Sequence, residues 1–261
     1  TTPESYELHQ AFAQMVEAGC EYAVMEVSSQ GIKMHRTDGL YFNYAIFTNI
    51  SPDHIGPGEH ADFEEYLYYK TRLLNMCGIG LVNKDDEHAP QIIKAANCEL
   101  YTYSEESKEA DFVASDIRYV SQPDFVGTEF HISGKYDMEV RLGIPGLFNV
   151  VNALAAVSVC SFLGLDQARI SHALENIRVN GRMEIVYTSE RCTVLVDYAH
   201  NAVSMESLLS TLRDYKPKRL VCVFGCGGNR SKDRRYSMGE IGGKMADFCI
   251  ITADNPRFEK N

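Results

Sequence analysis

No apolar run in this 261-residue chain approaches the about 20 consecutive residues that a membrane-spanning helix needs. The first residues also lack a basic segment followed by an apolar stretch, which is the pattern of a secretory signal peptide. Both absences argue against membrane insertion and secretion. We therefore expect a cytoplasmic protein.

Basic residues are too few for a protein that binds nucleic acid. The chain has 25 lysines and arginines against 36 aspartates and glutamates, which leaves a formal net charge of -11 at pH 7. Nucleic-acid-binding proteins neutralise phosphates with an excess of lysine and arginine. An anionic ligand of this protein would therefore have to meet a local cluster of positive charge.

The eight cysteines contain no CxxC pair, so the spacing of a zinc site is missing. Several of them, such as Cys160, Cys222 and Cys249, lie among apolar neighbours. Disulfide frameworks belong mainly to secreted proteins, whereas free thiols are typical of reducing compartments. We expect buried free thiols and neither a zinc site nor a disulfide framework.

Hydrophobic residues make up 45% of the chain, which is ample for a buried core, and their spacing alternates between strand and helix patterns. This alternation favours an α/β fold with a central, mostly parallel sheet flanked by helices. From residue 112 to 142, short alternating segments with turns predict a small antiparallel extension. Helices are expected at 5–17, 63–76, 89–96, 150–163, 166–177, 204–215 and 236–245, and strands at 22–27, 42–50, 79–83, 100–103, 193–196, 220–224 and 248–252.

A domain boundary is expected at Asn180-Gly181-Arg182, where the series of strands and helices restarts. Residues 1–181 would form a central domain, and residues 182–261 would form a second, Rossmann-like α/β domain. A doubly wound sheet commonly has more strands than this second segment holds. We therefore expect the second domain to be truncated.

Candidate catalytic residues follow apolar runs in the first seventy positions. Glu26 ends one run, Asp53 and His54 follow another, and Lys70 lies on a predicted helix. Because parallel sheets gather ligands at the carboxyl ends of their strands, these side chains would converge on one edge as a metal and phosphate site. The alternatives are a glutamate at a frayed strand end, a solvated loop histidine, which is also the expectation for His60, and a lysine whose apolar stem lies along the surface.

The segment FGCGGNR, residues 224–230, directly follows an apolar strand. Its glycines would let backbone amides approach phosphate or carboxylate oxygens, and Arg230 adds a guanidinium. The segment is not a Walker A loop, because no GxxxxGK[ST] pattern occurs in the chain. A plain tight turn and an anion site both remain open.

Taken together, the motifs of this chain resemble those of the Mur ligases, the ATP-dependent amide-forming enzymes of peptidoglycan precursor synthesis. The likeness is strongest to the branch that adds the third residue to UDP-N-acetylmuramoyl-L-alanyl-D-glutamate. Each motif alone is weak, but their order is highly specific and covers nearly the whole chain. The motifs are TTP at 1–3, MEVSS at 25–29, TN at 48–49 with DH at 53–54, EY at 65–66 with Lys70, GLFNVVN at 146–152, GRME at 181–184, DYAH at 197–200, GCGGNR at 225–230 and DNPR at 254–257.

The resemblance implies that ATP phosphorylates a substrate carboxylate and that an incoming amine attacks the acyl phosphate. Magnesium and cations would neutralise the triphosphate and the carboxylate. In the family the P-loop lies just before the TTP sequence. The chain is therefore expected to lack the N-terminal domain, the P-loop and the C-terminal end, and not to turn over ATP alone. The partners would be a UDP-muramoyl-dipeptide, ATP and an amino acid, bound by a monomer.

By the same resemblance, Glu26 and His54 would hold magnesium, as carboxylates and imidazoles can. The lysine that matches Lys70 carries a carbamate in the family, which replaces a positive by a negative charge and supplies oxygen ligands for a second magnesium ion. Asn152 and His200 fall where the family meets ATP. For His200, a plain residue at a strand end is the alternative.

Thr1, Thr2, Ser28 and Arg36 match family positions that hold the UDP-muramoyl-dipeptide. Hydroxyls and a guanidinium suit its phosphate, amide and carboxylate oxygens. The alternative for the hydroxyls is helix capping, because both segments precede helical stretches. The two roles are compatible.

The resemblance implies that five residues bind the amino acid to be added: Arg230, Asp254, Asn255, Pro256 and Arg257. In the family the arginine of DNPR marks enzymes that add meso-diaminopimelate, whose distant carboxylate pairs with a guanidinium, whereas L-lysine ends in an ammonium. The loop at 56–60 looks more like the lysine-adding branch. We favour diaminopimelate. The lysine-adding ligase, a folate polyglutamating enzyme and a non-catalytic Mur-like binding protein stay as alternatives.

Overall fold

The structure is a computed structural model that describes residues 2–52, 55–56, 58–229 and 232–259. The chain divides into two compact units, and each is made of more than one stretch of sequence. The first unit comprises Thr1–Ala114, Ser133–Tyr136 and Leu154–Gly164. The second comprises Ser115–Ile132, Asp137–Ala153 and Leu165–Asn261.

The first unit is built on parallel strands. Strands β1 (Phe42–Phe47), β2 (Cys77–Asn83) and β3 (Glu99–Ser104) are neighbours in chain order, and β3 pairs with the start of β4 (Phe112–Ser121). Each of these pairings is parallel. The expectation of a mostly parallel sheet in this part of the chain is therefore confirmed.

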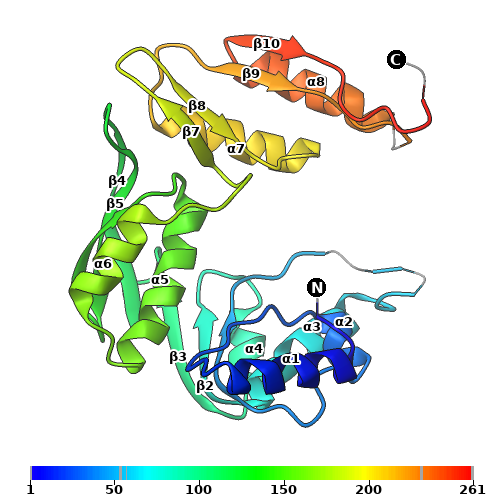
Figure 1. Cartoon of the computed structure of the whole chain (residues 1–261), viewed down its shortest axis with the longest axis vertical. Helices are drawn as coiled ribbons and strands as arrows, with labels where there is room; N and C mark the ends of the chain where they lie inside the picture. Colours follow the sequence, from blue (N-terminus) through cyan, green and yellow to red (C-terminus); the bar gives the residue numbers. More distant parts are fainter. Residues whose placement is uncertain (1, 53–54, 57, 230–231, 260–261) are drawn as a thin grey trace. The chain divides into compact units, whose positions relative to one another are not determined.

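Helices accompany these strands, and Figure 1 shows the first four in blue to cyan beside β2 and β3. They are α1 (Ser5–Glu17), α2 (Ser29–Lys33), α3 (Phe63–Thr71) with the 3-10 turn η1 (Arg72–Asn75), α4 (Ala89–Ala95) and the end of α5 (Leu147–Phe162). No helix formed by the described residues combines the length and the apolar character that crossing a membrane requires.

The core of the first unit explains why α3 and α4 lie where they do. Phe47 of β1 and Val82 of β2 belong to one buried cluster with apolar residues of both helices. Tyr66 and Leu67 represent α3 in this cluster, and Ile92 represents α4. The apolar spacing of each helix thus places one face on the sheet and leaves the other polar.

The second unit contains an antiparallel pair and a smaller α/β part. Its β5 (Val126–Gly134) and β6 (Met138–Leu142) pair antiparallel, as expected for the extension, and α6 (Gln167–Asn176) follows. The hairpin of β7 (Glu184–Thr188) and β8 (Thr193–Val196) precedes α7 (Ala202–Asp214). Strands β9 (Val221–Phe224) and β10 (Phe248–Ile251) are parallel and are connected through α8 (Asp233–Met245). Among the strands of the described ranges, β7 had no counterpart in the expected series.

The expectation of a strand at residues 22–27 is wrong. The segment runs between α1 and α2 without strand pairing, and the Val24 side chain is 99% exposed. A strand is held by ladder hydrogen bonds to a neighbour, and none of the described strands pairs with this segment. Glu26 therefore lies in an irregular loop and not at the end of a strand.

Candidate active site

The buried hydroxyl of Thr2 organises the loop that precedes α2. Thr2 is 2% exposed, and its Oγ1 accepts a hydrogen bond from the backbone N–H of Ser28 at 2.9 Å. The same hydroxyl donates to the carbonyl oxygen of Glu26 at 3.3 Å and lies 3.2 Å from the Ser28 hydroxyl. Gly31 makes room for this contact, because a Cβ at that position would lie 2.8 Å from the Cβ of Thr2.

Ser28 and Arg36 lie at the two ends of α2 and complete a polar cluster with Thr2. Ser28 is the N-cap of the helix, and its Oγ accepts from the backbone N–H of Gly31 at 3.0 Å. Arg36 donates through Nη1 to the carbonyl oxygen of Thr2 at 3.0 Å and forms an ion pair with Glu4 at 2.5 Å. The structure thus brings together Thr2, Ser28 and Arg36, which we call the Thr2 cluster. Thr1 lies outside the described residues.

The Thr2 cluster has spare capacity for a ligand. The Arg36 side chain is 26% exposed, while its Nε is buried and has no hydrogen-bond partner among the described residues. A guanidinium carries five N–H donors in a fixed fork, so the pairs with Thr2 and Glu4 do not exhaust it. The capping alternative for Ser28 is correct in geometry, whereas the N-cap of α1 is Glu4 and not Thr2.

The candidate metal residues are only partly described. The Glu26 side chain is exposed in the loop before α2. Asp53 and His54 lie outside the described residues. Within the ranges that the structure describes, no three His, Cys, Asp or Glu side chains gather as a metal site.

Lys70 projects from the last turn of α3 toward the segment that follows β1. Its Nζ donates to the carbonyl oxygen of Asn49 at 3.1 Å. The ammonium also lies 5.3 Å from the ring centroid of Tyr66 and 5.9 Å from that of Phe47. Lys70 is half-buried, so its apolar stem packs as the surface alternative predicts while its amine reaches the loop at the carboxyl end of β1.

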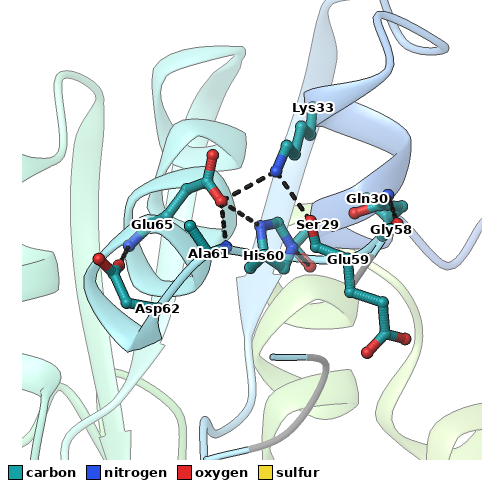
Figure 2. A network of polar contacts seen from close by, with 9 residues as sticks. All are labelled: Ser29, Gln30, Lys33, Gly58, Glu59, His60, Ala61, Asp62 and Glu65. Carbon is teal, nitrogen blue, oxygen red and sulfur yellow. Dashed lines mark hydrogen bonds and ion pairs between the residues drawn. The ribbon is translucent and has the colours of Figure 1, made fainter. Parts of the chain in front are cut away.

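A network that sequence reasoning missed connects α2 with α3 (Figure 2). The Glu65 carboxylate accepts from Lys33 Nζ at 2.9 Å and from the backbone N–H of Ala61 at 2.7 Å. The fully buried His60 ring lies 2.9 Å from Ser29 Oγ through Nε2 and 3.7 Å from Glu65 through Nδ1. The hydrogen bond from Lys33, with that from Ala61 adding to it, holds the pKa of the Glu65 carboxyl below its ordinary value. His60 is therefore not the solvated loop residue that we expected.

One local signal could have indicated part of this network. Asp62 and Glu65 are spaced as an N-cap residue and the third residue of a helix, which is the spacing of a capping box. The side chain of Asp62 accepts from the backbone N–H of Glu65 at 2.8 Å. The bond from Lys33 has no such signal, because the two residues are 32 positions apart.

In the second unit, the glycine-rich loop packs against the DNPR loop. Gly228 donates its N–H to the carbonyl oxygen of Asn255 at 2.8 Å, and a Cβ on Gly228 would lie 1.9 Å from the Pro256 carbonyl oxygen. The Asn229 side chain accepts from the backbone N–H of Phe258 at 3.0 Å. The glycines of this segment therefore allow a close approach of two backbones, which is a structural role for them.

The DNPR loop exposes its charged side chains. Asp254 accepts from the backbone N–H of Asn255 at 2.7 Å, and Asn255 accepts through Oδ1 from the backbone N–H of Arg257 at 3.0 Å. Arg257 adopts a left-handed backbone conformation with φ of 50° and is exposed, while Pro256 is half-buried. Arg230 lies outside the described residues.

The two candidate nucleotide residues lie on the surface of the second unit. Asn152 is exposed on α5, and His200 is exposed in the loop between β8 and α7. His200 Nδ1 lies 3.2 Å from the carbonyl oxygen of Tyr198, and the two rings are 5.1 Å apart. The Arg182 guanidinium lies 5.0 Å from the ring centroid of Tyr198. The two rings are tilted by 54° relative to each other, so this group offers aromatic faces and a cation close together.

Comparisons with known proteins agree over the whole chain. Residues 1–160 match the Mur ligase middle domain, and residues 181–261 match the Mur ligase glutamate ligase domain. The chain is 40% identical over 261 residues to UDP-N-acetylmuramoyl-L-alanyl-D-glutamate--2,6-diaminopimelate ligase 2 of Clostridium acetobutylicum, and 38% identical over 265 residues to the corresponding ligase of Caldanaerobacter subterraneus. The matches cover 100% and 99% of this chain and 53% of each relative, so the chain spans about half their length.

Solved structures extend the comparison to the fold. A structure of UDP-N-acetylmuramoyl-L-alanyl-D-glutamate--2,6-diaminopimelate ligase is similar with a TM-score of 0.79 and 30% identity, covering 100% of this chain and 54% of that one. Folylpolyglutamate synthase of Mycobacterium tuberculosis is similar with a TM-score of 0.67 at 20% identity, over 94% of this chain and 61% of that one. At that identity the second likeness shows the fold alone.

Proposed function

Because this chain belongs to the Mur ligase family, we propose that the full-length protein is an ATP-dependent amide ligase. It adds meso-diaminopimelate to UDP-N-acetylmuramoyl-L-alanyl-D-glutamate through an acyl-phosphate intermediate. The Thr2 cluster carries the proposal: the buried Thr2 hydroxyl holds the loop in shape, and the half-buried Ser28 hydroxyl and Arg36 guanidinium lie together as donors that suit an anionic amide substrate. The names of the relatives at 38–40% identity support the choice of substrates.

The Thr2 cluster would bind the UDP-muramoyl-dipeptide, with Thr1 beside it. Arg36, whose side chain is 26% exposed, would pair with an anionic oxygen of the substrate through the terminal N–H donors that Thr2 and Glu4 leave over. Ser28 would keep its capping role, because a hydroxyl can accept from the Gly31 N–H and still donate outward. This arrangement orients the substrate carboxylate that is to be phosphorylated.

Glu26, His54 and Lys70 would hold magnesium near the phosphate to be transferred. The exposed carboxylate of Glu26 fits this role, because magnesium prefers hard oxygen ligands. Magnesium would neutralise the charge of the triphosphate and of the departing diphosphate. The assignment of His54 as a magnesium ligand rests on the family motif alone, because this residue lies outside the described ranges.

Lys70 would act as a carbamate. Its ammonium would first lose one proton, and the neutral amine would then attack carbon dioxide and lose a second, so that a side chain of charge +1 becomes one of charge −1 with two oxygen ligands. Support comes from its place, since the amine reaches the carbonyl of Asn49 at the carboxyl end of β1. An unmodified ammonium at this place would repel a metal cation.

The remaining assignments follow the family motifs. Residues 1–181 would form the central domain and residues 182–261 the amino-acid-binding domain; the family matches to residues 1–160 and 181–261 support this division, whereas the compact units divide the chain differently. Asn152 and His200 would contact ATP, whose adenine could lie against the group of Tyr198 and Arg182. We propose that the protein acts in the cytoplasm as a monomer.

Diaminopimelate would bind between the glycine-rich loop and the DNPR loop. Arg257 would pair with its distant carboxylate together with Arg230, and the Asp254 and Asn255 turns would hold the loop in shape. The contact between Gly228 and Pro256 keeps the two loops adjacent. L-Lysine would bring an ammonium to Arg257 and be repelled.

The test is a ligation assay with the full-length protein. ATP, magnesium, UDP-N-acetylmuramoyl-L-alanyl-D-glutamate and either amino acid are supplied, and phosphate release and product mass are measured. We expect the diaminopimelate-containing product in large excess. Equal or better use of L-lysine would identify the lysine-adding ligase, and binding without phosphate release would identify a non-catalytic Mur-like protein.

A further inference from the structure

We propose that Glu65 is a positioning residue that locks α2 to α3 and thereby holds the Thr2 cluster in the shape that binds the anionic substrate. The inference rests on the proposed function for the identity of that substrate. Its structural content, the lock between two helices, stands on the contacts in Figure 2.

Helix α2 needs such a lock because it is very short. It has five residues, and isolated helices of that length are not stable in water. Ser28 caps its start, Lys33 is its last residue, and Arg36 follows one turn later. The position of α2 thus sets where both ligand-binding ends of the Thr2 cluster lie.

Lys33 is the side chain through which α3 holds α2. Its Nζ donates to Glu65 Oε2 at 2.9 Å and to the carbonyl oxygen of Glu59 at 2.9 Å. The side chains of Lys33 and Glu65 are 25% and 29% exposed, so water screens this pair less than a fully exposed one. The two acceptors, the Glu59 carbonyl oxygen before α3 and the Glu65 carboxylate in α3, together fix the position of the Lys33 ammonium.

His60 fills the space between the helices. The ring is fully buried, contacts the hydroxyl of Ser29 at 2.9 Å and lies 5.2 Å from the Tyr66 ring and 5.8 Å from the Tyr69 ring. The order Glu65, His60, Ser29 resembles that of a nucleophilic triad. Ser29, however, is 4% exposed, so its hydroxyl is closed to a substrate, and the network is a tie between helices.

The role of Glu65 exceeds capping. Glu65 accepts from the N–H of Ala61, which precedes the N-cap Asp62, and this bond needs only an acceptor, which glutamine also provides. The Ala61 N–H is therefore satisfied by either residue. Glutamine keeps an acceptor oxygen but lacks the negative charge that pairs with the Lys33 ammonium, so Glu65→Gln removes the ion pair of the lock.

The experiment compares Glu65→Gln with Glu64→Gln in the full-length protein. Glu64 is the exposed neighbour in the same first turn of α3, so both changes remove one charge from the same end of the helix. We expect the KM for the UDP-muramoyl-dipeptide to rise about tenfold in Glu65→Gln, with the KM for ATP and kcat within about threefold. Glu64→Gln should leave all three within about twofold. A purely structural defect would reduce the active fraction, and hence kcat, without raising this KM.

Two further variants test whether Lys33 is the partner. Lys33→Met should raise the same KM by a similar factor, and the double variant should show no additional increase, because both changes remove one interaction. Lys33→Arg should restore most of the affinity. Additive effects of the two single changes, or an unchanged KM in Glu65→Gln with an active enzyme, would overturn the inference and leave the proposed function intact.

A readout independent of the reaction separates the two proposals. Hydrogen exchange of the Gly31 and Ile32 amides in α2 should be about tenfold faster in Glu65→Gln than in Glu64→Gln. If the wild type ligates nothing, the proposed function fails and this measurement still decides the lock. Equal exchange in both variants would overturn the lock whatever the activity.

Discussion

The side-chain oxygen of Thr2 accepts a hydrogen bond from the backbone N–H of Ser28 at 2.9 Å across 26 positions of sequence. This contact ties the segment before α1 to the N-cap of α2. It also orients the Thr2 carbonyl, which accepts from Arg36. One buried hydroxyl thus determines the shape of a candidate substrate-binding surface.

Removing that hydroxyl should destabilise the protein and weaken substrate binding. Thr2→Val keeps the shape but leaves the Ser28 N–H without its acceptor, which we expect to cost about 1–3 kcal/mol of unfolding free energy. Urea unfolding and the KM for the UDP-muramoyl-dipeptide measure the two effects. Thr2→Ser retains the hydroxyl and should behave nearly as the wild type. Identical stability of Thr2→Val and Thr2→Ser would contradict the role of the hydroxyl.

Gly31 should not tolerate a methyl group, although it lies in a helix. Alanine is favoured over glycine in helices by about 1 kcal/mol, but a Cβ here would lie 2.8–2.9 Å from three side-chain atoms of Thr2. Because Thr2 is buried and hydrogen-bonded, we expect the steric clash to outweigh the helix propensity of alanine. Gly31→Ala should therefore lower the unfolding free energy by about 1–3 kcal/mol. Gly239→Ala in α8 has nothing within 4 Å of the added atom and should gain about 0.5–1 kcal/mol. Urea unfolding measures the stability of both variants, provided that the dependence of the unfolding free energy on urea is unchanged. A Gly31→Ala variant more stable than the wild type would show that Thr2 moves aside at little cost.

Acid should weaken the contact between the glycine-rich loop and its surroundings. Hydrogen bonds from Arg235 at 2.5 Å and from the Asn229 backbone hold the pKa of Glu259 below its ordinary value of 4.5. A depressed pKa in the folded state contributes stability above pH 4.5, and this contribution is lost as the pH falls through the folded pKa. Glu259→Gln should therefore lower Tm at pH 7, and the difference from the wild type should shrink as the pH falls below 4.5 and through the depressed folded pKa. A difference that stays constant over this range would refute the linkage.

Lys70→Ala in the full-length protein should lower kcat by about 100-fold, because the change removes a proposed metal ligand. Short carboxylates added to the assay should restore part of the rate by replacing the carbamate oxygens. Lys94→Ala, an exposed lysine on α4, is the matched control and should be silent. A Lys70→Ala enzyme with the normal rate and magnesium dependence would remove Lys70 from the metal site.

Arg257→Ala should lower kcat/KM for meso-diaminopimelate by about 10- to 100-fold, the value of a lost hydrogen bond to a charged group. The use of L-lysine should stay equal or improve, because the repulsion of its ammonium is relieved. The comparison of both amino acids with both enzymes measures the specificity. A parallel loss for the two substrates would mean that Arg257 holds the loop and does not read the side chain.

The sequence by itself determined most of the helices and strands, because their patterns are local. The apolar spacing predicted α1 with the bounds that the structure has, and the strands β2 and β3 lie within two residues of their expected limits. The same reasoning placed a strand at residues 22–27, where only the apolar run was visible. A strand also needs a neighbour, and pairing is not written in the run itself.

The candidate site divides in the same way. The motifs named Thr2, Ser28 and Arg36, but only the fold shows that one hydroxyl connects them. Nothing in the sequence indicated that Lys33 pairs with Glu65. The two residues are 32 positions apart, and no local spacing rule relates them. Local periodicity and capping fix elements at short range, whereas side chains 26 or 32 positions apart come together only through the packing of those elements.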